Sequence, residues 1–309
     1  MRFGLARAMF CLVLLLSCHS AEAREFKVLD AYGAYADSPS VNSPADYIAW
    51  LKRQPRFKDG QLDRLPDRAV ILHHVDARRM LNQLGYPAEE IEELRIGHID
   101  PNLLFVVRPK SAPAFIVNRG LPGAGGITTQ VAELGALGVK QAIHIGTAGL
   151  LGARLPYTSL IVANGSYKDG AAFLLASSAH EAAEQIALAD PALTDAVDQQ
   201  LIAARVAHKR ALGFTSPVYY FQKVGLLKSL LAFPFDPGKV PGYVEMEEAP
   251  FFVTARLAGM QAASIVVGSD RAVATGDTVR QEFFNGDLDA LLALTLRHAI
   301  ATLSAPKSR

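Results

Sequence analysis

The stretch YVEMEEAPFFVTARLAGMQAASIVVGSD, residues 243–270, decides the fold. It opens on an acidic cluster around Glu247 and continues with the apolar spacing of a helix over Ala249–Leu257. It ends in an apolar run, Ala262–Val267, that is followed by Asp270. A helix leading into a buried strand is typical of α/β sheets, in which ligands collect at the carboxyl ends of the strands. Glu247 and Asp270 are therefore the first candidates for chemistry.

The same alternation extends outward along the chain. Further apolar runs predict buried strands at Ala69–Leu72, Leu103–Val107, Ala114–Val117, Gln141–Ile145 and Ser159–Ala163. Further helical patterns cover Thr128–Leu137, Ser178–Leu188, Leu193–Arg205 and Leu288–Leu303. Strands that alternate with helices predict a largely parallel sheet covered on both faces. We expect this main domain to span residues 69–309, preceded by an extension over residues 24–68.

Residues 1–23 have the pattern of a secretory signal peptide. Arg2 and Arg7 are basic, Met9–Leu16 is apolar, and residues 21–23 have the small-x-small pattern of a cleavage site. An apolar run of about 10 residues is too short for a membrane span, which needs roughly 20. We expect an exported protein, periplasmic or secreted.

Both cysteines, Cys11 and Cys18, lie inside this segment, so cleavage after Ala23 would exclude cysteine catalysis. Alternatively, Leu15–Cys18 resembles a bacterial lipoprotein signal, which would attach the mature chain to a membrane through Cys18. We expect no other membrane partner. The 31 basic and 30 acidic residues nearly balance, which disfavours nucleic acid as a partner.

Two glycine-containing turns could bind an anion or a sugar. Residues 120–126, GLPGAGG, precede a helix whose first N–H groups are unpaired and could bind an anion. The same glycines could equally form a tight turn from strand to helix that binds no ligand. The strand over Gln141–Ile145 runs into a second turn that places His144 and Thr147 at its carboxyl end. His144 could equally be a hydrogen-bonded core histidine.

The acids of the opening stretch suit a sugar and a leaving group. Met246 lies between Glu245 and Glu247, so an apolar surface is flanked by two acceptors for vicinal hydroxyls. Acids before a helix are also ordinary complements of its dipole. Asp270 could donate a proton with help from Arg280, or the two could form a plain surface ion pair.

In this order, five segments resemble the nucleoside phosphorylase family: residues 120–126, 136–150, 165–171 (GSYKDGA), 243–270 and 279–285 (VRQEFFN). The resemblance implies a three-layer α/β/α subunit with a mixed, largely parallel central sheet. It implies a homo-oligomer, commonly a dimer or a trimer of dimers, that cleaves the N-glycosidic bond of a nucleoside. No metal or organic cofactor is implied, and inorganic phosphate is the co-substrate if the reaction is phosphorolysis.

The resemblance also assigns site residues. Glu245, Met246 and Glu247 bind the ribose. Asp270 is the general acid that protonates a purine base, assisted by Arg280, and this acid favours purine substrates. The other assigned groups are Tyr219, as the stacking ring, and Gln222 for the base, and Gly123, Gly125, His144 and Thr147 for phosphate.

The nucleophile is where the sequence departs from the family. The first phosphate loop is replaced by residues 73–79, HHVDARR, and His144 stands where phosphorolytic members have an arginine. We expect phosphorolysis through Thr147, His144, the glycine loop and Arg78 or Arg79. The alternatives are a nucleosidase that uses water, in which a glutamate could orient the water, and a binding or storage protein. The retained Asp270–Arg280 pair argues against the last.

Overall fold

The computed structural model describes residues 43–96, 102–175, 183–219 and 222–305. The predicted signal peptide, including Cys18, lies outside these residues. The helices are α3 (Pro44–Lys52), α4 (Ala77–Gln83), α5 (Gly123–Ala136), α6 (Gly170–Leu174), α8 (Pro191–Ala203), α9 (Val224–Ala232), α10 (Glu248–Leu257) and α11 (Leu288–Ser304), with 3-10 turns at Lys58–Asp63 and Ala88–Glu90. The strands are β1 (Arg68–Leu72), β2 (Ile91–Ile96), β3 (Asn102–Val107), β4 (Phe115–Arg119), β5 (Gln141–Leu151), β6 (Leu160–Tyr167), β7 (Ile186–Leu188), β8 (His208–Thr215), β9 (Pro241–Glu245), β10 (Gln261–Thr275) and β11 (Thr278–Phe283). Within the described ranges, no helix is long and apolar enough to cross a bilayer.

The described strands form one mixed sheet in the order β11-β10-β6-β8-β9-β5-β1-β4-β3-β2, with β7 paired to β6. Parallel pairing joins β4, β1, β5 and β10, and also joins β6, β8 and β9. Because β10 pairs with both β5 and β6, and β9 pairs with β5, the strands β5, β10, β6, β8 and β9 close into a ring. The carboxyl ends of β1, β4, β5 and β10 therefore meet at one edge, beside the ring.

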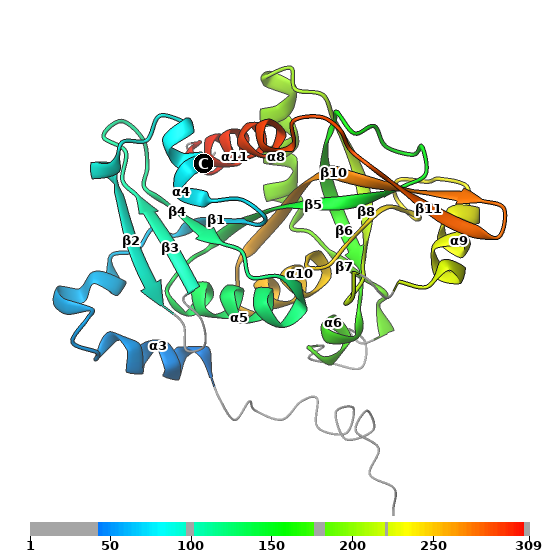
Figure 1. The fold of residues 1–309 in the computed structure, drawn as a ribbon. Coiled ribbons are helices and arrows are strands. Elements are labelled where there is room, and N and C mark those ends of the chain that lie inside the picture. The colour runs from blue at the N-terminus through cyan, green and yellow to red at the C-terminus, as the bar shows by residue number, and fades with distance from the viewer. Residues whose placement is uncertain (1–42, 97–101, 176–182, 220–221, 306–309) are drawn as a thin grey trace, which may run out of the picture. The chain divides into compact units, whose positions relative to one another are not determined.

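Helices cover both faces of the sheet (Figure 1). α3, α5, α6 and α10 pack together on one face, and α4, α8 and α11 lie on the other. Each interface is a continuous apolar core, one including Val131 and Phe251 and the other including Val197 and Leu296. The predicted three-layer α/β/α fold is confirmed.

Helix starts follow from capping chemistry. α8 and α11 each begin after an aspartate, Asp190 and Asp287, whose carboxylate accepts the backbone N–H three residues on, at 2.8 and 2.9 Å. α5 begins at Gly123, five residues before Thr128, where the sequence pattern predicts its start. The whole second half of the glycine loop is therefore the first turn of a helix.

One predicted helix is wrong at its end. The pattern over Ser178–Leu188 favours a helix, and residues 178–182 lie outside the described residues. Ile186–Leu188 forms β7 instead, which pairs with β6. The predicted extension also contributes to the core, since Ile48, Leu51 and Leu62 are buried in the cluster that includes α5. The boundary at residue 68 stays a prediction.

Candidate functional site

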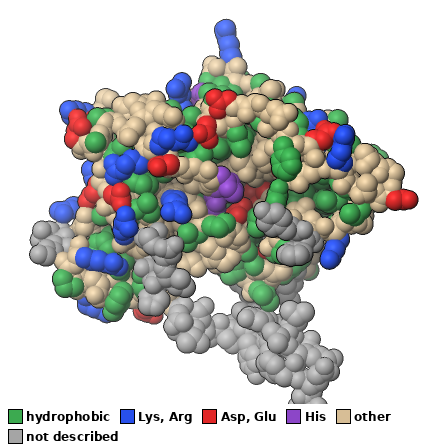
Figure 2. All heavy atoms as spheres, in the orientation of Figure 1, with side chains coloured by type: hydrophobic (Ala, Val, Ile, Leu, Met, Phe, Trp, Pro, Cys, Tyr) green, Lys and Arg blue, Asp and Glu red, His purple; other side chains and the backbone are tan. Residues whose placement is uncertain are grey.

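A cavity of about 750 Å³ opens where the carboxyl ends of the central strands meet. It is lined by His74, Pro122, Thr147, Ala148, Gly149, Tyr219, Gln222, Val224, Leu227, Val244, Glu245, Met246, Glu247, Ser269, Asp270, Ala272, Val279, Gln281 and Phe283. Figure 2 shows histidine and acidic side chains together in a hollow near the middle of the visible face. The site is thus built from β5, β9, β10, β11 and α9, together with the turns that follow β1, β4, β8 and β9.

Glu245, at the end of β9, organises the start of α10. One carboxylate oxygen accepts hydrogen bonds from Ser166, at 3.0 Å, and from Thr215. The other oxygen accepts from the backbone N–H groups of Glu247 and Glu248, the latter at 2.6 Å. Burial raises the pKa of Glu245, and these hydrogen bonds oppose that shift. Glu245 lines the cavity, but its oxygens are already engaged, so its main work is to hold the acidic turn in place.

Glu247 is the carboxylate that this turn presents to the cavity. It is only 5% exposed, and its Oε1 accepts a 2.7 Å hydrogen bond from the backbone N–H of Gly123, the first residue of α5. Burial, and secondarily the charge of Glu245, raise the pKa of Glu247 to about 7. Glu247 can therefore exchange a proton near neutral pH. Met246 lies beside it on the cavity wall, as the sequence predicts for a sugar site.

Asp270 lies across the cavity on β10, held by two neighbours. Its Oδ1 accepts from Ser269 at 2.8 Å, and its Oδ2 accepts from the Gln281 amide at 2.7 Å. The same amide donates to the Tyr219 hydroxyl at 3.0 Å. The close approach needs Gly149 on β5, where a Cβ would lie 2.9 Å from Asp270 Oδ2. Asp270, Gln281, Tyr219 and Gln222, which also lines the cavity, form a polar end suited to a heterocyclic base.

Arg280 does not join this group, which corrects the predicted pairing with Asp270. Side chains alternate along a strand, so Arg280 and Gln281 on β11 point to opposite sides. Gln281 reaches Asp270, while Arg280 is 64% exposed and pairs with Glu282. The hydrogen-bond partner of Asp270 is therefore Gln281, the residue after Arg280.

His144 is also displaced from its predicted role at the cavity. It is 1% exposed, its Nδ1 lies 2.9 Å from Ser264 Oγ, and its ring packs against Phe251 of α10. Its Nε2 has no hydrogen-bond partner among the described residues. Burial lowers its pKa well below the ordinary value, so the ring is neutral. His144 belongs to the layer beneath the site, because it lies three residues before the part of β5 that reaches the cavity.

Of the other predicted phosphate ligands, only Thr147 lines the cavity. The Gly123 N–H points to Glu247, so the protein's own carboxylate occupies the start of α5. Gly125 is exposed, and its carbonyl accepts a hydrogen bond from Thr129. The glycine loop therefore positions a carboxylate where the sequence predicts an anion from solution.

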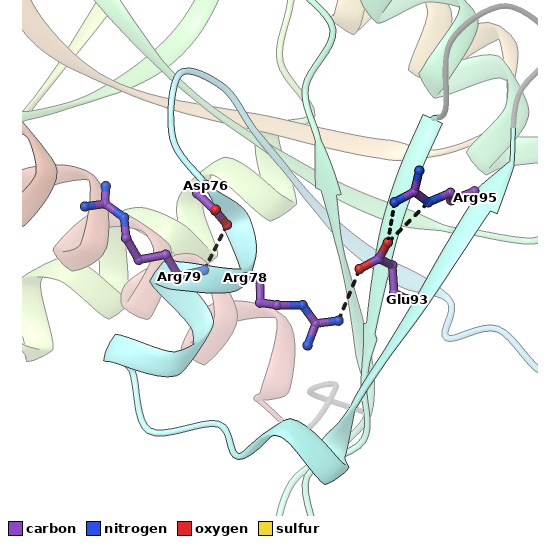
Figure 3. Close-up of polar contacts among 5 residues, drawn as sticks. All are labelled: Asp76, Arg78, Arg79, Glu93 and Arg95. Atoms are coloured by element: carbon purple, nitrogen blue, oxygen red, sulfur yellow. Dashed lines mark hydrogen bonds and ion pairs between the residues drawn. The ribbon is translucent and has the colours of Figure 1, made fainter.

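None of the candidate arginines lines the cavity. Arg78 pairs with Glu93 at 3.3 Å (Figure 3). Arg79 pairs with Asp289 at 2.5 Å. Arg119 ends β4 but is likewise not part of the lining. Among the residues that the structure describes, no lysine or arginine side chain forms part of the cavity wall. The wall carries three carboxyl groups, from Glu245, Glu247 and Asp270, and one imidazole, from His74.

The sequence does not single out three polar residues of this cavity, namely His74, Ser269 and Gln281. His74 lies two residues after the predicted strand over Ala69–Leu72, so its place near a strand's carboxyl end is the available signal. Gln281 could have been found from the alternation of β11, once Asp270 is placed opposite that strand.

A protein-family model described as the phosphorylase superfamily matches residues 76–303 of the chain. A search of curated protein sequences found no match.

Solved structures that share the fold include the following three. The purine nucleoside phosphorylase of Toxoplasma gondii, in complex with immucillin-H, has a TM-score of 0.58 and 17% identity over 78% of this chain and 90% of its own. The uridine phosphorylase of Vibrio fischeri, complexed with 6-hydroxy-1-naphthoic acid, has a TM-score of 0.56 and 18% identity, covering 79% and 90%. A mutant futalosine hydrolase of Helicobacter pylori has a TM-score of 0.56 and 16% identity, covering 77% and 98%.

Proposed function

The chain belongs to the phosphorylase superfamily, and we propose that it cleaves the N-glycosidic bond of a nucleoside, with water as the nucleophile. It is an enzyme of the nucleoside phosphorylase type, a group whose members need no cofactor. In the described residues no three His, Cys, Asp or Glu side chains cluster as a metal site. The observation that carries hydrolysis is the cavity wall, which contains carboxyl groups but no lysine or arginine among the described residues.

The sugar binds at Glu247 and Met246. The Glu247 oxygen that does not accept from Gly123 can accept a hydroxyl hydrogen, and the Met246 thioether offers an apolar surface to the ring. Since Glu247 is nearly buried, a hydrogen bond formed there is not weakened by competing water. This pair supports the ribose site that the sequence predicts.

The base binds at Asp270, with a purine as the preferred substrate. A departing purine becomes a better leaving group when its N7 is protonated, and Asp270 is positioned to supply that proton. Gln281 and Ser269 fix the carboxyl group in one orientation. Tyr219 lies at the mouth with its ring 42% exposed, where it can stack on the base.

Phosphorolysis, which the sequence favours, is the second candidate. Phosphate at neutral pH carries one to two negative charges, and like charges about 4 Å apart repel by about 4 kcal/mol at an effective dielectric constant of about 20. The Glu247 carboxylate lies in this cavity, and no lysine or arginine of the described residues compensates it at the cavity wall. Thr147 alone is a weak phosphate ligand. Water needs no such compensation, and the similar structures include a hydrolase as well as phosphorylases.

The test is a substrate panel. The protein without residues 1–23 is incubated with inosine, adenosine, guanosine and uridine, and release of the free base is measured. We expect cleavage of the purine nucleosides and much slower cleavage of uridine. Binding without turnover of any nucleoside would instead select the binding or storage protein.

We also propose export through residues 1–23, with cleavage after Ala23, so that the enzyme acts on scavenged nucleosides. The supporting pattern is in the sequence. Mass spectrometry of the mature protein distinguishes an N-terminus at Arg24 from a lipidated Cys18.

A homo-oligomer is the third part of the proposal. Several exposed apolar side chains lie on or beside the elements that form the mouth of the cavity, among them Val224, Leu226, Phe233 and Phe283. A second subunit covering them would remove this surface from water. Light scattering of the purified protein measures the assembly, and a monomer at all concentrations would contradict it.

A further inference from the structure

We propose that His74 activates the water that attacks the sugar, an inference that rests on the proposed hydrolysis of a nucleoside. His74 follows β1 and lines the cavity, and it belongs to neither the ribose site nor the base site. In the nucleosidase that the sequence leaves open as an alternative, a glutamate could orient the water. The structure offers an imidazole instead.

The backbone presents this imidazole under strain. His74 has φ = 67°, in the left-handed region that residues other than glycine rarely adopt. The residue before it is fixed, since the His73 N–H donates to the Ile145 carbonyl at 3.0 Å and the His73 ring is 2% exposed. The backbone turn sends one imidazole into the interior and the next to the cavity wall. Strained residues held this way cluster at functional sites.

The surroundings suit a proton acceptor. His74 is exposed at the cavity wall, and partial desolvation there lowers its pKa, so the neutral ring, which offers a lone pair, predominates at neutral pH. The rings of His73 and His144 behind it are also kept neutral by burial, the pKa of His73 being lowered to about 3. They therefore add no competing positive charge. When His74 takes a proton, the carboxyl groups of Glu247 and Asp270 in the same cavity stabilise the imidazolium.

The strand order puts His74 and Asp270 on separate strands of the sheet. β5 lies between β1 and β10, so the strand before His74 and the strand that carries Asp270 are two strand spacings, about 10 Å, apart. A sugar ring fills such a gap. Water arriving from the His74 side meets C1′ on the face away from a base held at Asp270, as a displacement requires.

The step balances. The water oxygen forms a bond to C1′ while the C1′–N bond breaks, and its electron pair leaves with the base. Asp270 gives a proton to the base, and His74 takes one from the water. The products are the free sugar and the free base, and solvent returns the proton from His74 to Asp270.

The test compares His74→Asn, His74→Ala and the wild type with inosine as substrate. Asparagine tolerates the left-handed backbone, so His74→Asn removes the imidazole without adding strain. We expect kcat to fall by about 10² to 10⁴-fold in both variants with KM nearly unchanged, and added imidazole to restore part of the rate in His74→Ala. His208→Gln is the matched control, because His208 bonds Asp198 and the Val206 carbonyl and is not part of the cavity wall. It should keep the wild-type rate.

Two failures are distinguishable. If the wild type cleaves no nucleoside, the proposed function fails. If the wild type hydrolyses inosine and His74→Asn, folded by circular dichroism, does so within threefold of the same rate, only the role of His74 is overturned. The role of His74 is also overturned if free imidazole restores no activity in His74→Ala and His208→Gln loses as much activity as the His74 variants.

Discussion

The backbone N–H of Gly123 donates a 2.7 Å hydrogen bond to Oε1 of Glu247. This contact joins the first residue of α5 to the acidic turn before α10, and it places a carboxylate at the positive end of α5. Anions from solution bind at such helix ends in many α/β proteins. Here the end is already occupied, so the cavity favours an uncharged sugar and water over phosphate.

Glu247 makes the stability of the fold depend on pH. Its folded pKa of about 7 lies above the ordinary 4.5, so between these values the folded state holds a proton that the unfolded chain has released. This contribution is complete below pH 4.5 and is lost as the pH rises to 7, an effect of about 3 kcal/mol. Glu247→Gln should remove it. Urea unfolding at pH 5 and pH 8 would show a smaller pH dependence in the variant, whereas parallel curves would contradict the raised pKa.

Asp270→Asn tests the proton donor. The amide keeps the shape of the side chain but cannot protonate the base, so cleavage of purine nucleosides should slow by about 10² to 10⁴-fold. Binding should change little, because the amide can still form hydrogen bonds. Rates and nucleoside affinity measured on the same preparation separate the two effects. An unchanged rate would remove Asp270 from the mechanism.

Gln281 and Arg280 form a matched pair on one strand. Gln281→Ala removes the donor that orients Asp270, and a partly buried hydrogen bond of about 1 kcal/mol corresponds to a rate loss of about 5-fold. Arg280→Gln breaks only an exposed pair with Glu282 and should change the rate less than twofold. Steady-state kinetics of both variants decide. The opposite ranking would restore Arg280 as the partner of the acid.

Gly149 permits the approach of Asp270. In Gly149→Ala the new Cβ would lie 2.9 Å from Asp270 Oδ2, so the carboxyl group must move, and we expect at least a tenfold loss of activity. Gly170→Ala is the control, because a Cβ there meets no atom within 4 Å. Equal activities of the two variants would show that the position of Asp270 is not critical.

The sequence predicts the long, buried elements well, because apolar runs such as Ala262–Val267 and helical patterns such as Leu193–Arg205 are set by local spacing. It fails at β7, where Ile186–Leu188 carries an apolar spacing that also fits a helix. Only the pairing with β6 selects the strand there, and such long-range contacts leave no local signal.

The residues of the site divide in the same way into those that the sequence pattern predicts and those that depend on the three-dimensional fold. Glu247 and Asp270 follow from their places at strand and helix ends, and both lie at the cavity. The sequence predicts that Arg280 and His144 lie at the cavity, but each side chain points elsewhere, since the direction of a side chain on a strand changes with every residue. His74 depends on a backbone conformation that no residue type in the sequence announces.

The most direct test of hydrolysis follows cleavage of inosine by the purified protein in phosphate-free buffer and in buffer with added phosphate, with identification of the sugar product. The cavity wall predicts equal rates in both buffers and free ribose as the product. A rate that depends on phosphate, with ribose 1-phosphate as the product, would contradict it.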